Sequence, residues 1–411
     1  MKKLAVLFSL GMFFAVAAGC GEGDSSSREV ADDMNFDIED YQKIIPANNK
    51  LGFKLLPEVE ADHNGNTFIS PASLFMAVSM IYNGADDVTK EEIAKTLNAE
   101  GISVRALNKA NASLLAALKK ETDDTRLHIA NAIWLNEDFH FQKDFAQHTK
   151  DYFHAETEEI DISDDKSPVK INDWVSETTN GKIEKIVDTP LNSDLVAILI
   201  NAIYFKGDWK SEFDKNETED QPFHLEDGTT KDVALMKLTE DLAYLENEEF
   251  QAVSLPYGDE EMSMKVFLPE ENSSLKEFKE TLTSQNWEVW NSEFRTQKGT
   301  ILLPKFQIEF EASLNETLQH LGMKSAFDKD ADFSQMIQED DPMWISQIKQ
   351  KTFIDVNEEG TEASASTSVE METTSASIDE PFHMEVNRPF FIAIVDEETE
   401  AIMFIGVINN P

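Results

Sequence analysis

The sequence contains few of the side chains that metal sites and catalytic centres need. Cys20 is the only cysteine in 411 residues, so no intramolecular disulfide can form. There are 8 histidines, and the nearest pair, His148 and His154, lacks the i,i+4 spacing of a helical zinc site. Neither a phosphate-binding glycine-rich loop nor a G-x-S-x-G motif occurs. The sequence therefore indicates no metal, no cofactor and no enzymatic activity.

Basic residues are also scarce, with 35 Lys and Arg against 79 Asp and Glu, which gives a formal net charge of −44. Phosphate binding needs a cluster of basic side chains, and none is present, so a nucleic acid is excluded as a partner. Such acidity keeps a protein surface solvated and self-repelling. A saline or alkaline habitat is one explanation of this composition.

The N-terminus has the pattern of a secretory signal peptide over residues 1–19. Lys2 and Lys3 precede an apolar run, Leu4–Val16, which small residues at 17–19 follow. That run is too short to span a bilayer. We therefore expect this segment to direct export.

Cys20, directly after the small residues, resembles the lipidated cysteine of bacterial lipoproteins, although their pattern usually has Leu where Ala17 stands. Two or more acyl chains bind a membrane firmly, so residues 20–37 would be a lipidated, flexible tether. We expect a membrane-anchored lipoprotein at the bacterial cell surface or in the extracellular space. An ordinary signal peptide with an incidental cysteine is the alternative.

Residues 38–411 show no repeat and no linker before residue 360, which favours one domain. Ser70 can cap a helix over Leu74–Tyr82, and Thr89–Glu92 has the form of a capping box that starts another helix. Later segments are apolar or alternating and predict strands: 128–135, 195–205, 262–268, 301–310, 390–395 and 401–408. Helices followed by long strands indicate an α+β fold.

A segment near the C-terminus is unusual in composition. From Glu359 to Asn387 there is no Lys or Arg, and residues 361–377 are mostly Ser, Thr, Ala, Glu and Val. Composition alone predicts a disordered linker. A linker should lead to another module, whereas here two apolar strands, around Phe390 and Phe404, end the chain.

Alternation in this segment predicts that it can also form a strand. Successive side chains of a strand point to opposite faces. One face would carry only small or apolar residues: Thr361, Ala363, Ala365, Thr367, Val369, Met371 and Thr373. The other would carry every acid: Glu362, Ser364, Ser366, Ser368, Glu370, Glu372 and Thr374. The segment therefore suits both an exposed loop and a strand with one buried face.

Several motifs resemble those of the serpins. They include the hinge motif VNEEGTEA (356–363) and the signature NRPF (387–390) in MEVNRPFFIAI, with FISP at 68–71, NDWVSETTNGKIEKIV at 172–187, NAIYFKGDWKSEF at 201–213, LPK at 303–305 and FIG at 404–406. The resemblance covers nearly everything after the tether. It implies three β-sheets, about nine helices and an exposed reactive loop over about residues 358–385.

The resemblance also implies a mechanism. A target serine protease cleaves the reactive loop and forms an acyl-enzyme through its own serine. The freed loop then inserts into the central sheet as an additional strand and distorts the protease before hydrolysis. The resemblance therefore implies a suicide-substrate inhibitor that acts as a monomer. Its native state would be kinetically trapped.

By the same resemblance, individual residues acquire roles. The hinge comprises Glu358, Gly360, Thr361, Glu362, Ala363, Ser364 and Ala365. Glu358 would pair with Lys305 beside Trp209, where the strand enters. The region that parts for it would contain Ser70, Ser73, Asn201 and Gln350, the last at a position where the family often has His.

The family's usual spacing places the scissile bond between Thr374 and Ser375, and a shift of one residue would give Thr373-Thr374 or Ser375-Ala376. Small side chains there favour an elastase-like or subtilisin-like target over a trypsin-like one. Cleavage after Glu372 by a glutamyl-specific protease is a further alternative.

Two other functions remain open from the sequence. A non-inhibitory, serpin-like binding protein would never insert its loop, although such relatives usually have charged or bulky hinge residues. A membrane-anchored hydrolase would need a nucleophile with a base, which the motifs do not provide.

Overall fold

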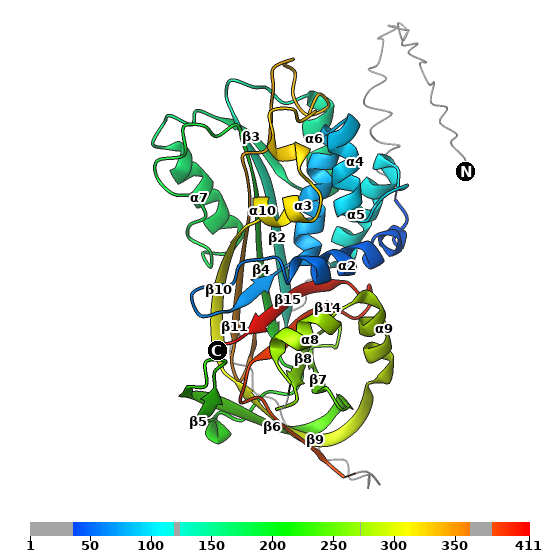
Figure 1. Cartoon of the computed structure of the whole chain (residues 1–411), viewed down its shortest axis with the longest axis vertical. Coiled ribbons are helices and arrows are strands. Elements are labelled where there is room, and N and C mark those ends of the chain that lie inside the picture. The colour runs from blue at the N-terminus through cyan, green and yellow to red at the C-terminus, as the bar shows by residue number, and fades with distance from the viewer. Residues whose placement is uncertain (1–35, 119–123, 272, 362–379) are drawn as a thin grey trace, which may run out of the picture. The chain divides into compact units, whose positions relative to one another are not determined.

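The computed structural model describes residues 36–118, 124–271, 273–361 and 380–411 (Figure 1). Its described helices begin with the 3-10 helix η1 (Asp40–Lys43), and two more 3-10 turns follow later, η2 (Lys215–Glu217) and η3 (Ser325–Phe327). The α-helices are α2 (Ile45–Leu55), α3 (Pro71–Gly84), α4 (Asp87–Thr96), α5 (Val104–Leu118), α6 (Lys143–Phe153), α7 (Ser167–Thr178), α8 (Leu275–Thr281), α9 (Ser284–Glu293) and α10 (Asn315–His320).

The described strands form a six-stranded and a nine-stranded sheet. The six-stranded sheet has the order β10 (Phe306–Ser313), β11 (Gln347–Val356), β12 (Gly360–Thr361), β4 (Ala197–Asp208), β2 (Thr125–Asn136) and β3 (Glu156–Ile160). The nine-stranded sheet has the order β1 (Thr67–Ile69), β15 (Ile402–Ile408), β14 (Phe390–Asp396), β8 (Met262–Pro269), β7 (Phe250–Tyr257), β6 (Thr230–Glu246), β9 (Arg295–Pro304) and β13 (Phe382–Glu385), with β5 (Glu219–His224) beside β6.

The nine-stranded network combines two of the three sheets that the resemblance to the serpins implies. Strand β6 is 17 residues long and belongs to both. Its residues 243–246 pair with β7, whereas residues 235–244 pair with β9. A single long strand therefore joins the two sheets by hydrogen bonds.

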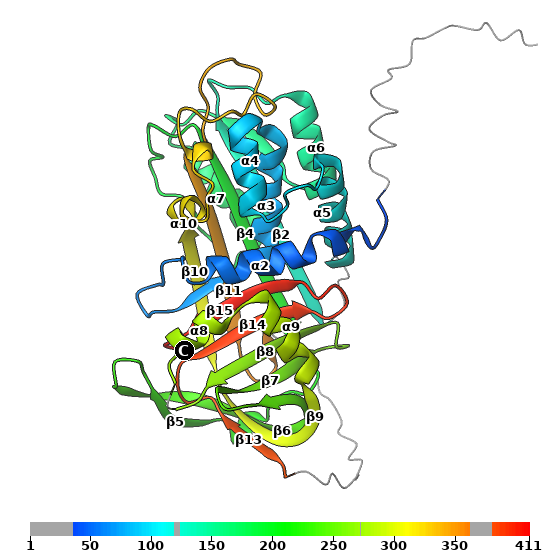
Figure 2. The same ribbon diagram turned by 45° about the vertical axis from the view of Figure 1, so that its right-hand side comes forward.

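Two apolar cores lie on opposite faces of the six-stranded sheet. Alternate residues of β4 show this division, because Leu199 and Ile203 belong to the main core, whereas Ile198 and Ile200 belong to a second core with α7. Burial on both faces explains the almost continuous apolar sequence of β4. Figures 1 and 2 show α3, α4, α5 and α6 on one face of this sheet and α7 on the other.

Helix α3 begins as the sequence predicts. The Ser70 hydroxyl accepts a hydrogen bond from the Ser73 backbone N–H at 3.2 Å, and Pro71 occupies the first turn. The predicted helix over 74–82 lies within it, and almost every residue of α3 is buried. This helix packs on the centre of the six-stranded sheet.

Two local predictions are wrong. Helix α4 starts at Asp87 with Asp86 as its N-cap, so Thr89 is not a cap; its hydroxyl instead accepts a hydrogen bond from the Asp332 N–H at 3.0 Å. The segment 301–310 is not one strand, because Lys305 separates β9 from β10. Pro304 has no N–H with which to continue a sheet ladder, which favours a break here.

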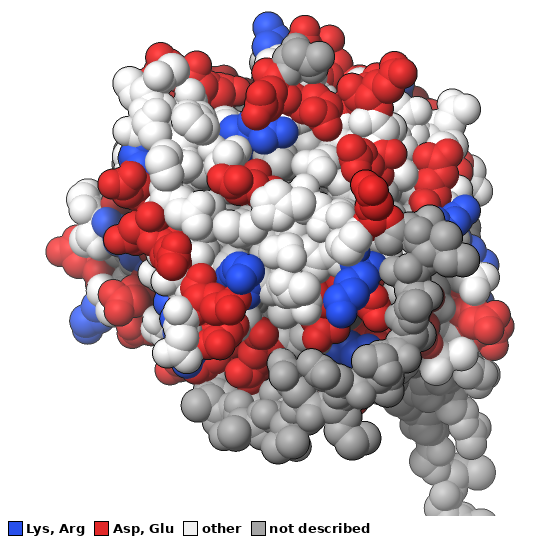
Figure 3. Space-filling view, turned by 90° about the horizontal axis from the view of Figure 1, so that it is seen from below, with Lys and Arg blue, Asp and Glu red and all other residues white. Residues whose placement is uncertain are grey.

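Acidic side chains are spread over the face shown in Figure 3, and Lys and Arg form no continuous area on it. In the described part of the chain, no helix has both the length and the hydropathy needed to cross a bilayer. Within the same residues, no group of three or more His, Cys, Asp or Glu side chains is arranged to hold a metal ion.

Candidate functional site

The described start of the predicted hinge already lies within the six-stranded sheet. Gly360 and Thr361 form β12 between two strands, where Thr361 pairs with Gly207 of β4 and with Val356 of β11. Beyond these residues, β4 and β11 pair directly with each other along 198–204 and 347–353. The hinge thus occupies the open end of a seam between β4 and β11.

The described start of the predicted loop, residues 358–361, is therefore buried or partly buried rather than exposed, whereas Glu380 and Pro381 near its other end are exposed. Thr361 is fully buried and Glu358 is 6% exposed. Gly360 is needed here because a Cβ atom would lie 2.2 Å from the Gly207 carbonyl oxygen. Backbone contact this close fixes the first residues of the hinge between the strands.

Two stacked aromatic rings lie next to the hinge at this end of the seam. Trp209 stacks on Tyr257 with ring centroids 4.4 Å apart. The Tyr257 hydroxyl and the Thr361 hydroxyl share a hydrogen bond of 2.7 Å, and burial raises the pKa of Tyr257 far above its ordinary value. The Trp209 indole N–H donates to the Asn357 carbonyl at 2.9 Å. The hinge is therefore held by side chains as well as by strand pairing.

The ion pair predicted between Glu358 and Lys305 is present. The Lys305 ammonium lies 2.8 Å from the Glu358 carboxylate, and the Thr218 hydroxyl donates to the same carboxylate at 3.0 Å. Burial alone raises the pKa of Glu358, but the hydrogen bonds from Lys305, its own backbone and Thr218 outweigh it and leave the pKa below the ordinary value. Glu358 therefore stays ionised and stabilises the native hinge at neutral pH.

Around the hinge, acidic side chains outnumber the basic side chains that pair with them. Glu359 pairs with Lys215. Asp208, which pairs with Gly360, has a buried Oδ1 without a hydrogen-bond partner among the described residues. Burial raises the pKa of Asp208, and the charges of Asp124 and Glu359 raise it further, against the opposing effect of Lys206 and Arg126. An ionised Asp208 therefore destabilises this end of the seam.

We expect Asp208→Asn to raise the apparent thermal midpoint at pH 7, measured by circular dichroism at a fixed heating rate. Because the pKa of Asp208 is raised in the native protein, native stability is lost as pH rises through that pKa. The gain from the amide should therefore shrink as the pH is lowered toward the ordinary pKa of aspartate. Asp138→Asn, at an exposed position in the turn after β2, is the control. A lower midpoint for Asp208→Asn at pH 7 would contradict this account.

The residues predicted to lie where the sheet opens form a buried polar cluster at the middle of the seam. Gln350 of β11 accepts from the Ser70 N–H at 2.9 Å, and its amide nitrogen donates to the Ser70 carbonyl at 2.9 Å and to the Asn201 side-chain oxygen at 2.6 Å. The Asn201 amide donates to the hydroxyl of Ser73 and to the side chain of Asn131, the latter at 2.6 Å. The Gln350–Asn201 bond crosses directly from β11 to β4.

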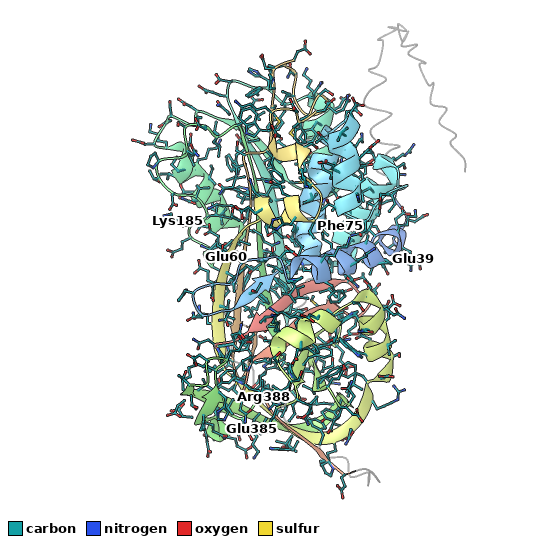
Figure 4. The ribbon with its side chains drawn as sticks, viewed as in Figure 1. Glu39, Glu60, Phe75, Lys185, Glu385 and Arg388 are labelled. Carbon is teal, nitrogen blue, oxygen red and sulfur yellow. The ribbon has the colours of Figure 1, made fainter. Side chains whose placement is uncertain are left out.

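The segment after α7 lies across the outer face of the same seam. The Lys349 ammonium donates to the Ile186 carbonyl at 2.8 Å, and the Lys351 ammonium donates to the Lys185 carbonyl at 2.6 Å. Lys185 is labelled beside the sheet in Figure 4. Widening the seam must therefore break or move these contacts as well.

At the other end of the predicted loop, the chain joins the nine-stranded sheet as β13, which pairs with β9. Phe382 stacks on Tyr244 at 4.1 Å and packs over Gly299, where a Cβ atom would lie 2.1 Å from its ring. Arg388 of the NRPF signature donates from Nε to the Pro269 carbonyl at 2.9 Å (Figure 4). Both ends of the predicted loop are thus anchored in sheets.

Several predicted site residues lie outside the described residues: Cys20, Glu362, Ala363, Ser364, Ala365, Thr374 and Ser375. Three residues that contact the site were not predicted. These are Tyr257, Thr218 and Asn131, which bind Thr361, Glu358 and Asn201 respectively. Each comes from a strand or turn remote in sequence from its partner, so no local motif could have indicated it.

Comparison with known proteins gives the family to which this fold belongs. Residues 46–411 match the family model "Serpin (serine protease inhibitor)". Iripin-2 of Ixodes ricinus is 31% identical over 383 residues, covering 90% of this chain and 94% of that protein. Serpin B4 of Homo sapiens is 32% identical over 387 residues, covering 89% and 98% respectively.

Among solved structures, the thermophilic serpin tengpin in its native state is similar with a TM-score of 0.84 at 34% identity, covering 92% of this chain and 95% of that one. This chain belongs to the serpin family. Serpins are generally protease inhibitors rather than catalytic enzymes, although not every member inhibits.

Proposed function

We propose that this serpin is a single-use inhibitor of serine endopeptidases that traps the acyl-enzyme by inserting its cleaved loop into the six-stranded sheet. One observation carries the proposal: Gly360 and Thr361 already form the first residues of a strand between β4 and β11. The chain that follows them has an uncharged alternate face from Thr361 to Thr373. Strand formation therefore needs only to continue along the seam.

The register of β12 defines where each inserted residue would lie. Thr361 pairs with Gly207 and Val356, and both neighbouring strands run antiparallel to β12. Continued without a bulge, the same register puts Ala363 between Phe205 and Ile354, which belong to the main core. The uncharged face would be buried against that core.

The same register puts Thr367 between Asn201 and Gln350 at the centre of the seam. Adjacent strands lie about 4.8 Å apart, so an inserted strand doubles the separation of β4 from β11. The hydrogen bond of 2.6 Å between Gln350 and Asn201 cannot persist across that distance. The hydrogen bonds of the polar cluster therefore favour the closed seam. They must be broken and replaced by other hydrogen bonds when a strand inserts.

The proposed scissile bond is Thr374-Ser375, and the proposed targets are subtilisin-like or elastase-like proteases, with glutamyl-specific cleavage after Glu372 as the second candidate. Lipidation of Cys20 would hold the inhibitor, as a monomer, at a bacterial membrane facing the extracellular space. Export and the anchor rest on the N-terminal sequence pattern alone.

The second candidate function is a non-inhibitory binding protein with the same fold. It would keep the seam closed after loop cleavage. Small residues at 361, 363 and 365 favour the inhibitor because a bulky or charged residue on this face would obstruct insertion. The hydrolase alternative would need a nucleophile with a base, which the sequence motifs do not provide.

The proposal is tested by mixing the purified protein with subtilisin and, separately, with pancreatic elastase. We expect loss of protease activity together with a covalent adduct that survives denaturing electrophoresis. Mass spectrometry of the released C-terminal peptide should give the cleaved bond. Complete loop cleavage with neither adduct nor inhibition, for these and a glutamyl-specific protease, would favour the binding protein.

A further inference from the structure

A cavity of about 520 Å³ lies between helix α7 and strand β3, far from the hinge. Strand β3 is the edge of the six-stranded sheet, and Trp134 of the neighbouring β2 forms part of the cavity lining. Trp174 of α7 meets Trp134 nearly edge-on, with ring centroids 6.0 Å apart. The cavity therefore combines a helix wall, a strand and two indole rings.

The charged lining of this α7–β3 cavity is acidic in excess, with four acidic side chains against Lys166 and Lys170. Lys170 pairs with Glu158 at 2.9 Å. Within the described chain, three further acids of the lining make no ion pair or side-chain hydrogen bond: Glu156, Asp173 and Glu177. The cavity therefore favours a positively charged ligand over an anion.

The ring of Trp134 already contacts a cationic side chain of the same chain. The Lys170 ammonium lies 5.6 Å from the centre of its ring, within the range of a cation–π interaction. Trp134 is 1% exposed, yet its indole N–H has no hydrogen-bond partner among the described residues. Lys170 is 53% exposed, and exposed ion pairs contribute little, so its ammonium can leave the ring. Another cation could then take its place.

We propose that the α7–β3 cavity binds a small organic cation that carries an aromatic ring. Its ammonium group would replace that of Lys170 over Trp134, near Asp173 and Glu156, and its ring would pack against Trp174. Tryptophan faces and nearby carboxylates are the groups that recognise such cations. This binding site is separate from the seam and does not depend on protease inhibition.

The test uses 2-phenylethylammonium and its neutral analogue 2-phenylethanol, with the full chain labelled at its tryptophan indoles for NMR titration. Substituting Trp134 and Trp174 by Phe in turn assigns their signals. We expect saturable shifts at both indoles, with the cation binding about tenfold more tightly than the alcohol. Protease is absent, so the result is independent of inhibition.

Removing a positive charge and removing negative charges from helix α7 should change cation binding in opposite directions. Lys170→Ala uncovers the ring and removes a competing charge, so it should tighten binding of the cation about threefold or more. Asp173→Asn combined with Glu177→Gln should weaken it by a similar factor. Glu288→Gln, at an exposed position on α9, is the control and should have no effect.

Three outcomes would overturn the proposal. They are absence of saturable shifts at millimolar cation, equal affinity for the alcohol and the amine, and weaker cation binding by Lys170→Ala. All of the charge substitutions are at partly or fully exposed positions, so native folding is expected and is checked by the unchanged indole signals outside the cavity.

Discussion

Ala363→Arg should turn the inhibitor into a substrate. In an inserted strand that continues the register of β12, residue 363 would lie between Phe205 and Ile354 of the main core. Burying an unpaired guanidinium there costs several kcal/mol, and each 1.4 kcal/mol changes a rate about tenfold. Slower insertion lets the protease hydrolyse the acyl-enzyme first. We expect the number of inhibitor molecules consumed per protease to rise by about tenfold or more, measured by titration of protease activity.

Glu362→Arg is the matched control, one residue away on the opposite face. In the inserted strand its neighbours would be Lys206 and Asp355, both partly exposed. A long side chain can reach solvent there. The control should inhibit with nearly unchanged stoichiometry. Equal effects of arginine at 362 and at 363 would show that the face assignment is wrong.

Gln350→Met should destabilise the intact protein strongly and the loop-cleaved protein much less. In the intact protein the substitution leaves the Ser70 N–H and the Asn201 side-chain oxygen without their buried partner. We expect a loss of about 2–4 kcal/mol, seen as a lower apparent thermal midpoint. In the cleaved protein the bond across the seam is already broken, so less remains to be lost.

Gln347→Met is the control for this comparison, because it makes the same change on the same strand at a partly exposed position. It should leave both forms almost unchanged. If Gln350→Met lowered the midpoints of the intact and cleaved proteins equally, the polar cluster would have no role in keeping the seam closed.

Much of the fold could be predicted from the sequence because its strands have strong apolar patterns. The runs at 262–268 and 390–395 coincide with the cores of β8 and β14. The start of α4 could not be predicted in this way. Thr89 has the residue type of a cap, but the distant Asp332 N–H uses its hydroxyl. Only the tertiary structure shows that Asp86, and not Thr89, is the N-cap of this helix.

The candidate site shows the same division between local and distant information. The family motif predicted that Glu358 and Lys305 would pair, and they do. Nothing in the sequence indicated that the hinge would already occupy the seam, because that depends on Tyr257 and Asp208 from other strands. Local patterns therefore identified the segment that we propose to insert, whereas the native position of its first residues required the structure.

The central claim is that cleavage releases the segment after Thr361 to become a strand of much lower free energy. The most direct test compares the thermal unfolding of intact protein with that of protein cut once between residues 373 and 379, as verified by mass spectrometry. Our account predicts a markedly higher midpoint for the cleaved form. A cleaved form that unfolds at or below the temperature of the intact protein would contradict it.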